Sequence, residues 1–357
     1  MEQSLFKNWI AEYMPQLVLR VVEKYNDEAQ MPTYLFKQFL TKKFSVDGRW
    51  TSLSVNNQLV VADVVAMDSS IPLKARASLG KATGDIPKMA MEFQIREQEL
   101  TELDTLIALG QNDQALQKLF SDIPMVIGGQ YERLEAQFLE LASSGVCEYD
   151  QTETVGTAVR IDVGFLAENK FDASLAWSNP LATPITDIQT VVDKVQTDGK
   201  VVTKAMMDRA TFNKLKNSEE GKSLYASFIG NFGNALTTPS QNQFISAFRD
   251  DLGFDIVIIE RSVVLQRDGV NTTVKPWKAG SVTLITSDNL GSYVWATLAE
   301  KNNPVAGVSY ETADDFILVS KFRMNRPSLM EVTNSQSRVC AVLDNVDSIY
   351  LLNTIVA

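Results

Sequence analysis

The stretch between Asp122 and Gly145 carries the clearest regular pattern in the sequence, and it favours one long α-helix. Five apolar residues recur there at alternating steps of four and three, the spacing of one helix face: Ile127, Tyr131, Leu134, Phe138 and Leu141. Asp122 suits the N-cap, Pro124 the first turn, and Ser144–Gly145 the end. We predict a helix of about 20 residues, roughly 30 Å long, whose apolar stripe packs into a core. Three glutamates lie off that stripe: Glu132, Glu135 and Glu140.

Composition allows an ordinary globular protein with one large domain or two to three small ones. The 357 residues are 45% hydrophobic and 22% charged, within the usual range. The formal net charge of −11 argues against an outer surface that wraps nucleic acid through phosphate contacts. It does not exclude a protein that encloses nucleic acid without gripping it.

The residues that usually carry catalysis or hold metals are scarce. The chain has no histidine, which removes histidine-based triads, metal ligands and near-neutral proton shuttles. Cys147 and Cys340 are too few for a zinc site, and we predict two reduced, partly buried thiols. No secretion signal and no apolar run of about 18 residues is present. We therefore predict a soluble protein made in a cytoplasm, without catalytic residues, cofactor, metal or membrane partner.

Along the chain, helical and strand-like patterns mix, so the predicted fold class is α+β. The pattern predicts a helical arm over 1–40, a hairpin near Asp47–Gly48 and a strand over 57–67. Helix resumes from Gln94, and 157–165 alternates like a half-buried strand. A small α/β unit occupies 180–300. Two apolar strands follow, at 316–324 and 348–357.

Residues 70–93 form a basic stretch in an acidic chain. The stretch contains only two carboxylates but four cations, which are Lys74, Arg76, Lys81 and Lys88. Prolines and glycines in the stretch, among them Gly80, Gly84 and Pro87, are expected to break any long helix or strand. We therefore predict a long basic loop.

Motifs for other chemistry fail on inspection. The segment "LGKATGD" at 79–85 lacks the first glycine and the final Ser/Thr of a phosphate-binding P-loop. The adjacent carboxylates Asp250–Asp251 and Asp314–Asp315 diverge on any helix or strand, so neither pair is a ready acid/base dyad. We expect both pairs on the solvated surface.

The order of these parts resembles the major capsid protein of tailed bacteriophages, the Hong Kong ninety-seven phage fold. More narrowly, the chain is similar to the lambda-type capsid protein E family. The most specific segment is "WSNPLATPITDIQTVVDKVQTDGKVVTKAMMDRATFNKLKNSEE" at 177–220, with its Trp-Ser, Thr-Pro-Ile, Gly-Lys and Thr-Phe-x-x-Leu steps. The helix at 122–145 is a second, weaker match. The resemblance covers essentially the whole chain.

The resemblance implies a domain plan, which we state as an expectation. It comprises an N-terminal arm (1–45), peripheral-domain strands (46–69), an extended loop (70–95), a peripheral domain (96–170) with the spine helix (122–145), an axial domain (180–312) and return strands of both domains (313–357).

The resemblance also implies function and partners. The chain is expected to assemble with itself into hexamers and pentamers of an icosahedral shell, which encloses double-stranded DNA without sequence-specific binding. Assembly would take place in the host bacterial cytoplasm and end in the virion. Lys74, Arg76, Lys81 and Lys88 would contact the acidic neighbouring subunit. Only about 40 residues precede the first strand pair, which favours a separate scaffolding protein over a built-in one. A portal protein is a further expected partner, and the fold leaves room for a decoration protein.

Alternatives remain open at this point. An encapsulin, which is a cellular nanocompartment of the same fold, is the second choice. An enzyme in the 180–300 unit and a tail-tube or sheath protein follow. Some relatives cross-link a loop lysine to an asparagine next door, a role for Lys81 and Asn325, but no specific pattern supports it here.

Overall fold

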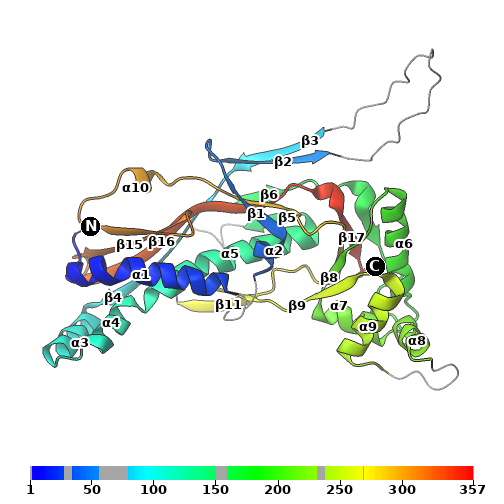
Figure 1. The fold of residues 1–357 in the computed structure, drawn as a ribbon, viewed down its shortest axis with the longest axis horizontal. Helices are drawn as coiled ribbons and strands as arrows, with labels where there is room; N and C mark the ends of the chain where they lie inside the picture. The colour runs from blue at the N-terminus through cyan, green and yellow to red at the C-terminus, as the bar shows by residue number, and fades with distance from the viewer. Residues whose placement is uncertain are drawn as a thin grey trace, which may run out of the picture.

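The computed structural model describes residues 2–27, 34–55, 79–149, 159–230, 238–267 and 269–356. The molecule is elongated, with one lobe around a sheet and the helix α1, and a second lobe of strands covered by α6 to α9 (Figure 1). The long helix α5 runs through the middle of the body, between the two lobes. The fold is therefore mixed α+β, as predicted.

The helices form both long and short elements. In chain order they are α1 (Lys7–Asn26), α2 (Leu35–Phe39), α3 (Glu97–Ala108), α4 (Asn112–Phe120), α5 (Asp122–Ser144), α6 (Pro184–Thr197), α7 (Arg209–Asn217), α8 (Glu219–Phe228), α9 (Gln241–Leu252) and α10 (Ala299–Asn302). Two 3₁₀ turns lie at Ala167–Asn169 and Val346–Ser348.

Two larger sheets organise the lobes. The first has the order β1 (Leu40–Phe44), β13 (Gly291–Trp295), β16 (Met330–Leu343), β15 (Ile317–Met324) and β14 (Ser309–Ala313), and β4 (Lys88–Arg96) also pairs with β16. The second has the order β7 (Lys170–Asp172), β17 (Ile349–Asn353), β12 (Ser281–Ile285), β8 (Lys204–Asp208) and β9 (Asp255–Ile259).

Three two-stranded ribbons complete the described strands. They are β2 (Arg49–Val55) with β3 (Leu79–Asp85), β5 (Val146–Tyr149) with β6 (Val159–Asp162), and β10 (Val263–Arg267) with β11 (Val270–Val274). The β2–β3 ribbon lies along the upper edge of the body in Figure 1, and Trp50 and Ser52 of β2 are buried there.

Helix α5 matches its sequence pattern in extent but differs at its start. It covers 23 residues, and Gly145 ends it in the left-handed conformation that glycine adopts most readily, φ 81°. Asp122 is the first helical residue and caps nothing, so the capping prediction is wrong. The pair Gly128–Gly129 serves close packing, because a Cβ on Gly128 would lie 2.2 Å from the Tyr25 hydroxyl.

The apolar stripe of α5 lies in the main hydrophobic core. All five of its residues, Ile127, Tyr131, Leu134, Phe138 and Leu141, are 0% exposed. Phe138 stacks on Phe39 of α2 with ring centroids 5.8 Å apart. The sheet that contains β16 packs along the same helix. The spacing of the apolar residues on α5 therefore determines which face of the helix packs against α2 and the first sheet.

The segment that carries the resemblance, 177–220, is held together by contacts between its own ends. Trp177 Nε1 donates to Asp187 Oδ2 at 2.9 Å, and Asp187 is only 7% exposed. Glu220 Oε2 accepts the backbone N–H of Ile185 at 2.7 Å and satisfies a donor at the start of α6. A second hydrophobic cluster fills this lobe and includes Tyr350 and Leu352 of β17.

The basic stretch 70–93 is more regular than its sequence suggested. Its second half contains β3 and most of β4, so the expectation that Gly80 and Gly84 would break a strand is wrong, whereas Pro87 does separate the two strands. The glycines fit because β3 lies in an exposed ribbon, where Trp50 covers Gly84, and Pro87 falls between the two strands. The predicted strand at 57–67 lies outside the described residues.

Strand β16 is the main element that sequence reasoning missed. It spans 14 residues and pairs with β13, β15 and β4. Thr333, Ser335 and Ser337 lie on one face of the strand, and all three are 0% exposed. Buried polar residues remove the apolar alternation that identifies a strand.

Candidate functional site

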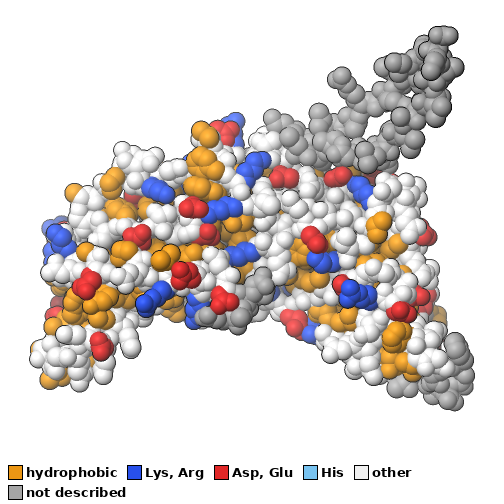
Figure 2. Space-filling view, viewed as in Figure 1, with side chains coloured by type: hydrophobic (Ala, Val, Ile, Leu, Met, Phe, Trp, Pro, Cys, Tyr) orange, Lys and Arg blue, Asp and Glu red, His pale blue; other side chains and the backbone are white. Residues whose placement is uncertain are grey.

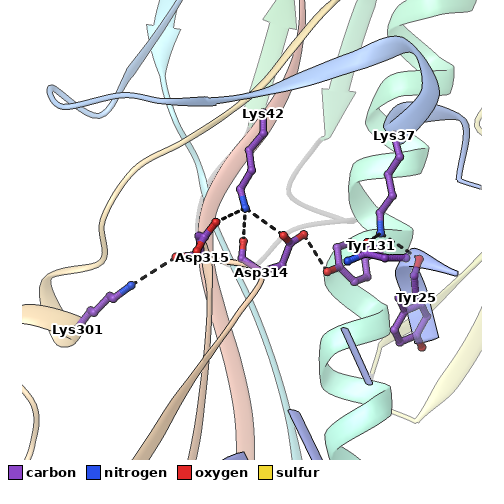
Figure 3. A network of polar contacts seen from close by, with 8 residues as sticks. Tyr25, Lys37, Lys42, Tyr131, Lys301, Asp314 and Asp315 are labelled. Carbon is purple, nitrogen blue, oxygen red and sulfur yellow. Dashed lines mark hydrogen bonds and ion pairs between the residues drawn. The ribbon is translucent and has the colours of Figure 1, made fainter. Parts of the chain in front are cut away.

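A polar junction joins the N-terminal segment, helix α5 and the turn between β14 and β15 (Figure 3). Asp314 and Asp315 form this turn with positive φ values of 48° and 65°, a conformation in which Asp is among the better-tolerated residues. Lys42 Nζ of β1 lies 3.0 Å from Asp314 Oδ1 and 2.6 Å from Asp315 Oδ2. Burial would lower the pKa of Lys42, but the bonds to both aspartates outweigh it and raise the pKa.

The junction continues into α5 through Tyr131. Its hydroxyl donates to Asp314 Oδ2 at 3.0 Å, and burial raises the pKa of this tyrosine. Lys37 Nζ lies 4.2 Å from the centre of the Tyr131 ring and donates to the carbonyl of Tyr25 at 3.1 Å. The expectation that Asp314 lies on the solvated surface is therefore wrong, whereas Asp250 and Asp251 are exposed as expected.

Asp314→Ala is expected to destabilise the subunit by about 1–3 kcal/mol, because it removes the acceptor of Tyr131 and places alanine at positive φ. Asp314→Asn should cost less, since the amide oxygen can accept a hydrogen bond and Asn tolerates this conformation. Urea unfolding of unassembled subunits measures both, and equal losses would contradict the assignment.

Glu135 shows that one glutamate of α5 is structural. It is 0% exposed, and its carboxylate accepts the backbone N–H groups of Leu35 at 3.1 Å and Phe36 at 3.0 Å. It thus satisfies the first donors of α2 from another helix. Burial raises its pKa, although these two bonds oppose the shift. Spacing alone put Glu135 off the apolar stripe and gave no sign of this role.

A second buried charge group lies at the other end of the sheet. Lys321 is 0% exposed, and its Nζ donates to the carbonyl of Leu119 and the hydroxyl of Thr333, both at 2.7 Å. Burial lowers the pKa of Lys321 to about 8. Glu331 is also 0% exposed and accepts the N–H of Leu5 at 2.8 Å. These contacts fix the N-terminal segment and α4 to the sheet.

Nothing in the described part of the chain resembles a reaction centre. No group of three His, Cys, Asp or Glu residues converges there to hold a metal ion. Cys147 and Cys340 are free and buried, and burial raises the pKa of both thiols, which makes them inert. No helix within the described ranges combines the length and the apolar character that a membrane span requires.

Comparison with known proteins decides the family. A family model described as phage major capsid protein E matches residues 19–338. The chain belongs to the phage major capsid protein E family. It is a structural subunit of the icosahedral shell of a phage virion, and it associates with copies of itself. Membership in this family favours the interpretation as a capsid protein over an encapsulin, an enzyme or a tail-tube protein.

Solved structures agree with this capsid fold. A protein assigned as the capsid protein of a prophage of E. coli CFT073 is 13% identical with a TM-score of 0.59, and the match covers 95% of this chain and 98% of that one. A phage-related protein from Bordetella bronchiseptica RB50 is 12% identical with a TM-score of 0.53, over 94% and 95% of the two chains. No curated protein sequence matches this chain.

The four predicted interface residues of the capsid subunit are not brought into one described cluster. Lys74 and Arg76 lie outside the described residues. Lys81 belongs to β3, where only the backbone is described. Lys88 begins β4, is exposed, and lies directly opposite Arg338 of β16. The interface role of all four stays a prediction.

Proposed function

We propose that this capsid subunit forms hexamers and pentamers that close into a shell around double-stranded phage DNA. The observation that carries the proposal is the β2–β3 ribbon, which packs on the body through Trp50 and Ser52 of β2 but pairs with no other described strand (Figure 1). A two-stranded ribbon needs further strands or further packing to be stable in water. A neighbouring subunit would supply the missing support.

The ribbon supports a revised domain plan. We propose Arg49–Asp85 as the extended element in place of 70–95, because β4 belongs to the first sheet. Residues around that sheet and α5 would form the peripheral domain, and the lobe of α6 to α9 the axial domain. On this plan Lys74, Arg76 and Lys81 lie within the extended element, whereas Lys88 lies at its base.

Electrostatic attraction supports contact between this element and a neighbouring copy. The element carries four cations and three carboxylates between Arg49 and Asp85, a net charge of +1, whereas the chain as a whole has a net charge of −11, so attraction to another copy is concentrated at Lys74, Arg76 and Lys81. Each exposed ion pair contributes only about 0–1 kcal/mol. Many identical contacts in a closed shell nevertheless set register and orientation.

Replacement of Lys74, Arg76 and Lys81 by Glu is expected to abolish closed shells at physiological salt while leaving subunit stability unchanged. Electron microscopy measures the shells, and urea unfolding of unassembled subunits measures stability. The matched Gln variants, which remove charge without reversing it, should assemble with reduced yield. Normal shells from the Glu variant would contradict the proposal.

The remaining partners rest on the capsid family. We propose that the subunit assembles in the host cytoplasm with a separate scaffolding protein and a portal protein. The finished shell would also have space to bind a decoration protein. Electron microscopy of the chain expressed with and without its neighbouring genes tests this proposal. Closed shells from the chain alone would argue against a separate scaffold, and DNA-filled particles would support the phage assignment.

A further inference from the structure

Residues 2–5 lie at one end of the first sheet, and we call them the strap. Strand β14 begins at Ser309, which lies opposite Lys321 of β15. Glu2 takes a place farther along the same edge of β15, opposite Arg323. Two backbone hydrogen bonds of 2.9 Å join Glu2 and Arg323 in antiparallel pairing. Figure 1 marks the N-terminus at this end of the sheet. The strap therefore covers backbone groups of β15 that β14 leaves free.

Two charged side chains of the sheet hold the strap in place. Arg323 Nη2 donates to Glu2 Oε2 at 2.6 Å. Glu331 Oε1 accepts the backbone N–H of Leu5 at 2.8 Å. Arg323 and Glu331 lie directly opposite each other on β15 and β16, so they form one anchor beneath the strap. The contacts that fix the strap to the sheet are thus few and polar.

The strap buries little apolar surface of its own. Ser4 is 6% exposed, whereas Leu5 is 49% exposed and Glu2 is exposed as well. Figure 2 shows mostly polar and basic surface at the end of the molecule where Figure 1 marks the N-terminus. Phe6, the residue after the strap, stacks on Trp9 of α1 with ring centroids 6.0 Å apart. Ordering four residues costs conformational entropy similar to what a few hydrogen bonds return, so the docked strap is only weakly favoured.

Two buried polar atoms beneath the strap lack partners. Arg323 Nε and Glu331 Oε2 are shielded from solvent and have no hydrogen-bond partner within the part of the chain that the structure describes. Both atoms belong to the side chains that hold the strap. A buried polar atom without a partner costs free energy, which contact with water relieves. The docked strap therefore carries a penalty that its opening removes.

We propose that the strap opens and closes on the first sheet while the rest of the subunit stays folded. In the closed state it occupies the edge of β15 at Arg323. In the open state the N–H and C=O groups of Arg323 lose their partners, and water reaches Glu331. Free backbone groups on a strand edge can accept another strand, so the strap controls whether this edge is available for pairing. The proposal concerns the folded subunit and does not depend on how subunits assemble.

Thiol labelling of Ser4→Cys in unassembled subunits measures the opening. Position 4 is 6% exposed, so the introduced thiol reacts mainly when the strap is open. Its reaction with an aromatic disulfide reagent is expected to be at least about a hundredfold faster than that of Cys147 and Cys340, which are 0% exposed. Urea below the unfolding transition should not accelerate it, because local opening exposes little surface. Ser320→Cys, 1% exposed within β15, is the matched control and should react as slowly as the native cysteines.

Two outcomes of the labelling would overturn the proposal. Equal rates for Ser4→Cys and Ser320→Cys would mean that the strap opens only with the whole subunit. Reaction of Ser4→Cys at the rate of Val46→Cys, whose position is 92% exposed, would mean that the strap is never docked.

A second substitution tests whether the anchor holds the strap. Glu2→Gln in the Ser4→Cys protein removes the charge that Arg323 binds, so labelling should become about threefold faster or more. Glu23→Gln, at an exposed position of α1, should leave the rate unchanged. An unchanged rate with Glu2→Gln would show that Arg323 does not hold the strap, which would overturn the assignment of the anchor.

Discussion

Glu135→Ala should lower the free energy of unfolding of the subunit by about 2–5 kcal/mol, because two buried N–H groups would lose their acceptor. Leu35 and Phe36 donate to this carboxylate at 3.1 and 3.0 Å, in a site without solvent exposure. Among the described residues, Glu135 is the acceptor given for these first donors of α2. Urea unfolding of unassembled subunits measures the loss.

Two further variants make the Glu135 experiment specific. Leu35 and Phe36 donate to different oxygens of Glu135, so Glu135→Gln keeps one of the two acceptors and should cost less than alanine, about 1–3 kcal/mol. Glu12→Ala, at an exposed position of α1, should have little effect. If the alanine and glutamine variants at 135 proved equally stable, the hydrogen bonds to α2 would not matter.

Lys321 should make stability depend on pH in the alkaline range. Burial lowers its pKa in the folded subunit to about 8, against 10.5 as the ordinary value. Between these values the unfolded chain binds the proton and the folded chain does not, so stability rises with pH. Because of Lys321, the free energy of unfolding should therefore increase by about 2 kcal/mol between pH 7 and 9.5.

The measurement is the difference in unfolding free energy between wild type and Lys321→Met across this pH range. Taking the difference removes the contributions of tyrosines and other lysines, which both proteins share. Lys88→Met, at an exposed lysine of the same sheet, should retain the wild-type pH dependence. A difference that stays constant from pH 7 to 9.5 would contradict the burial of a charged Lys321.

Sequence reasoning succeeded where one apolar face is buried. Helix α5 follows its apolar stripe from Ile127 to Leu141, which lies in the main hydrophobic core. The α+β class and the capsid family also came from the sequence. These features depend on the spacing of apolar residues within short segments, and a single sequence contains that information.

The remaining features depend on contacts between distant residues. Glu135 and Lys321 are charged residues whose burial is set by partners about 100 and 200 positions away. Strand β16 hides polar side chains against α5, so Ser335 donates to the carbonyl of Val126 at 2.6 Å. Asp314 likewise meets Lys42 across 272 positions. No pattern within a short window can reveal such pairings.

The position of β17 in the second sheet affects how the subunit folds during its synthesis on the ribosome. It lies between β7 and β12 in the second sheet, and Tyr350 and Leu352 belong to the core of that lobe. The residues from Lys170 to Ile285 therefore cannot complete their sheet until 349–353 have left the ribosome tunnel. A nascent chain that stops short of this strand would keep an open sheet edge and an unfinished core. Chains that end before β17 are therefore expected to be poor subunits for the shell.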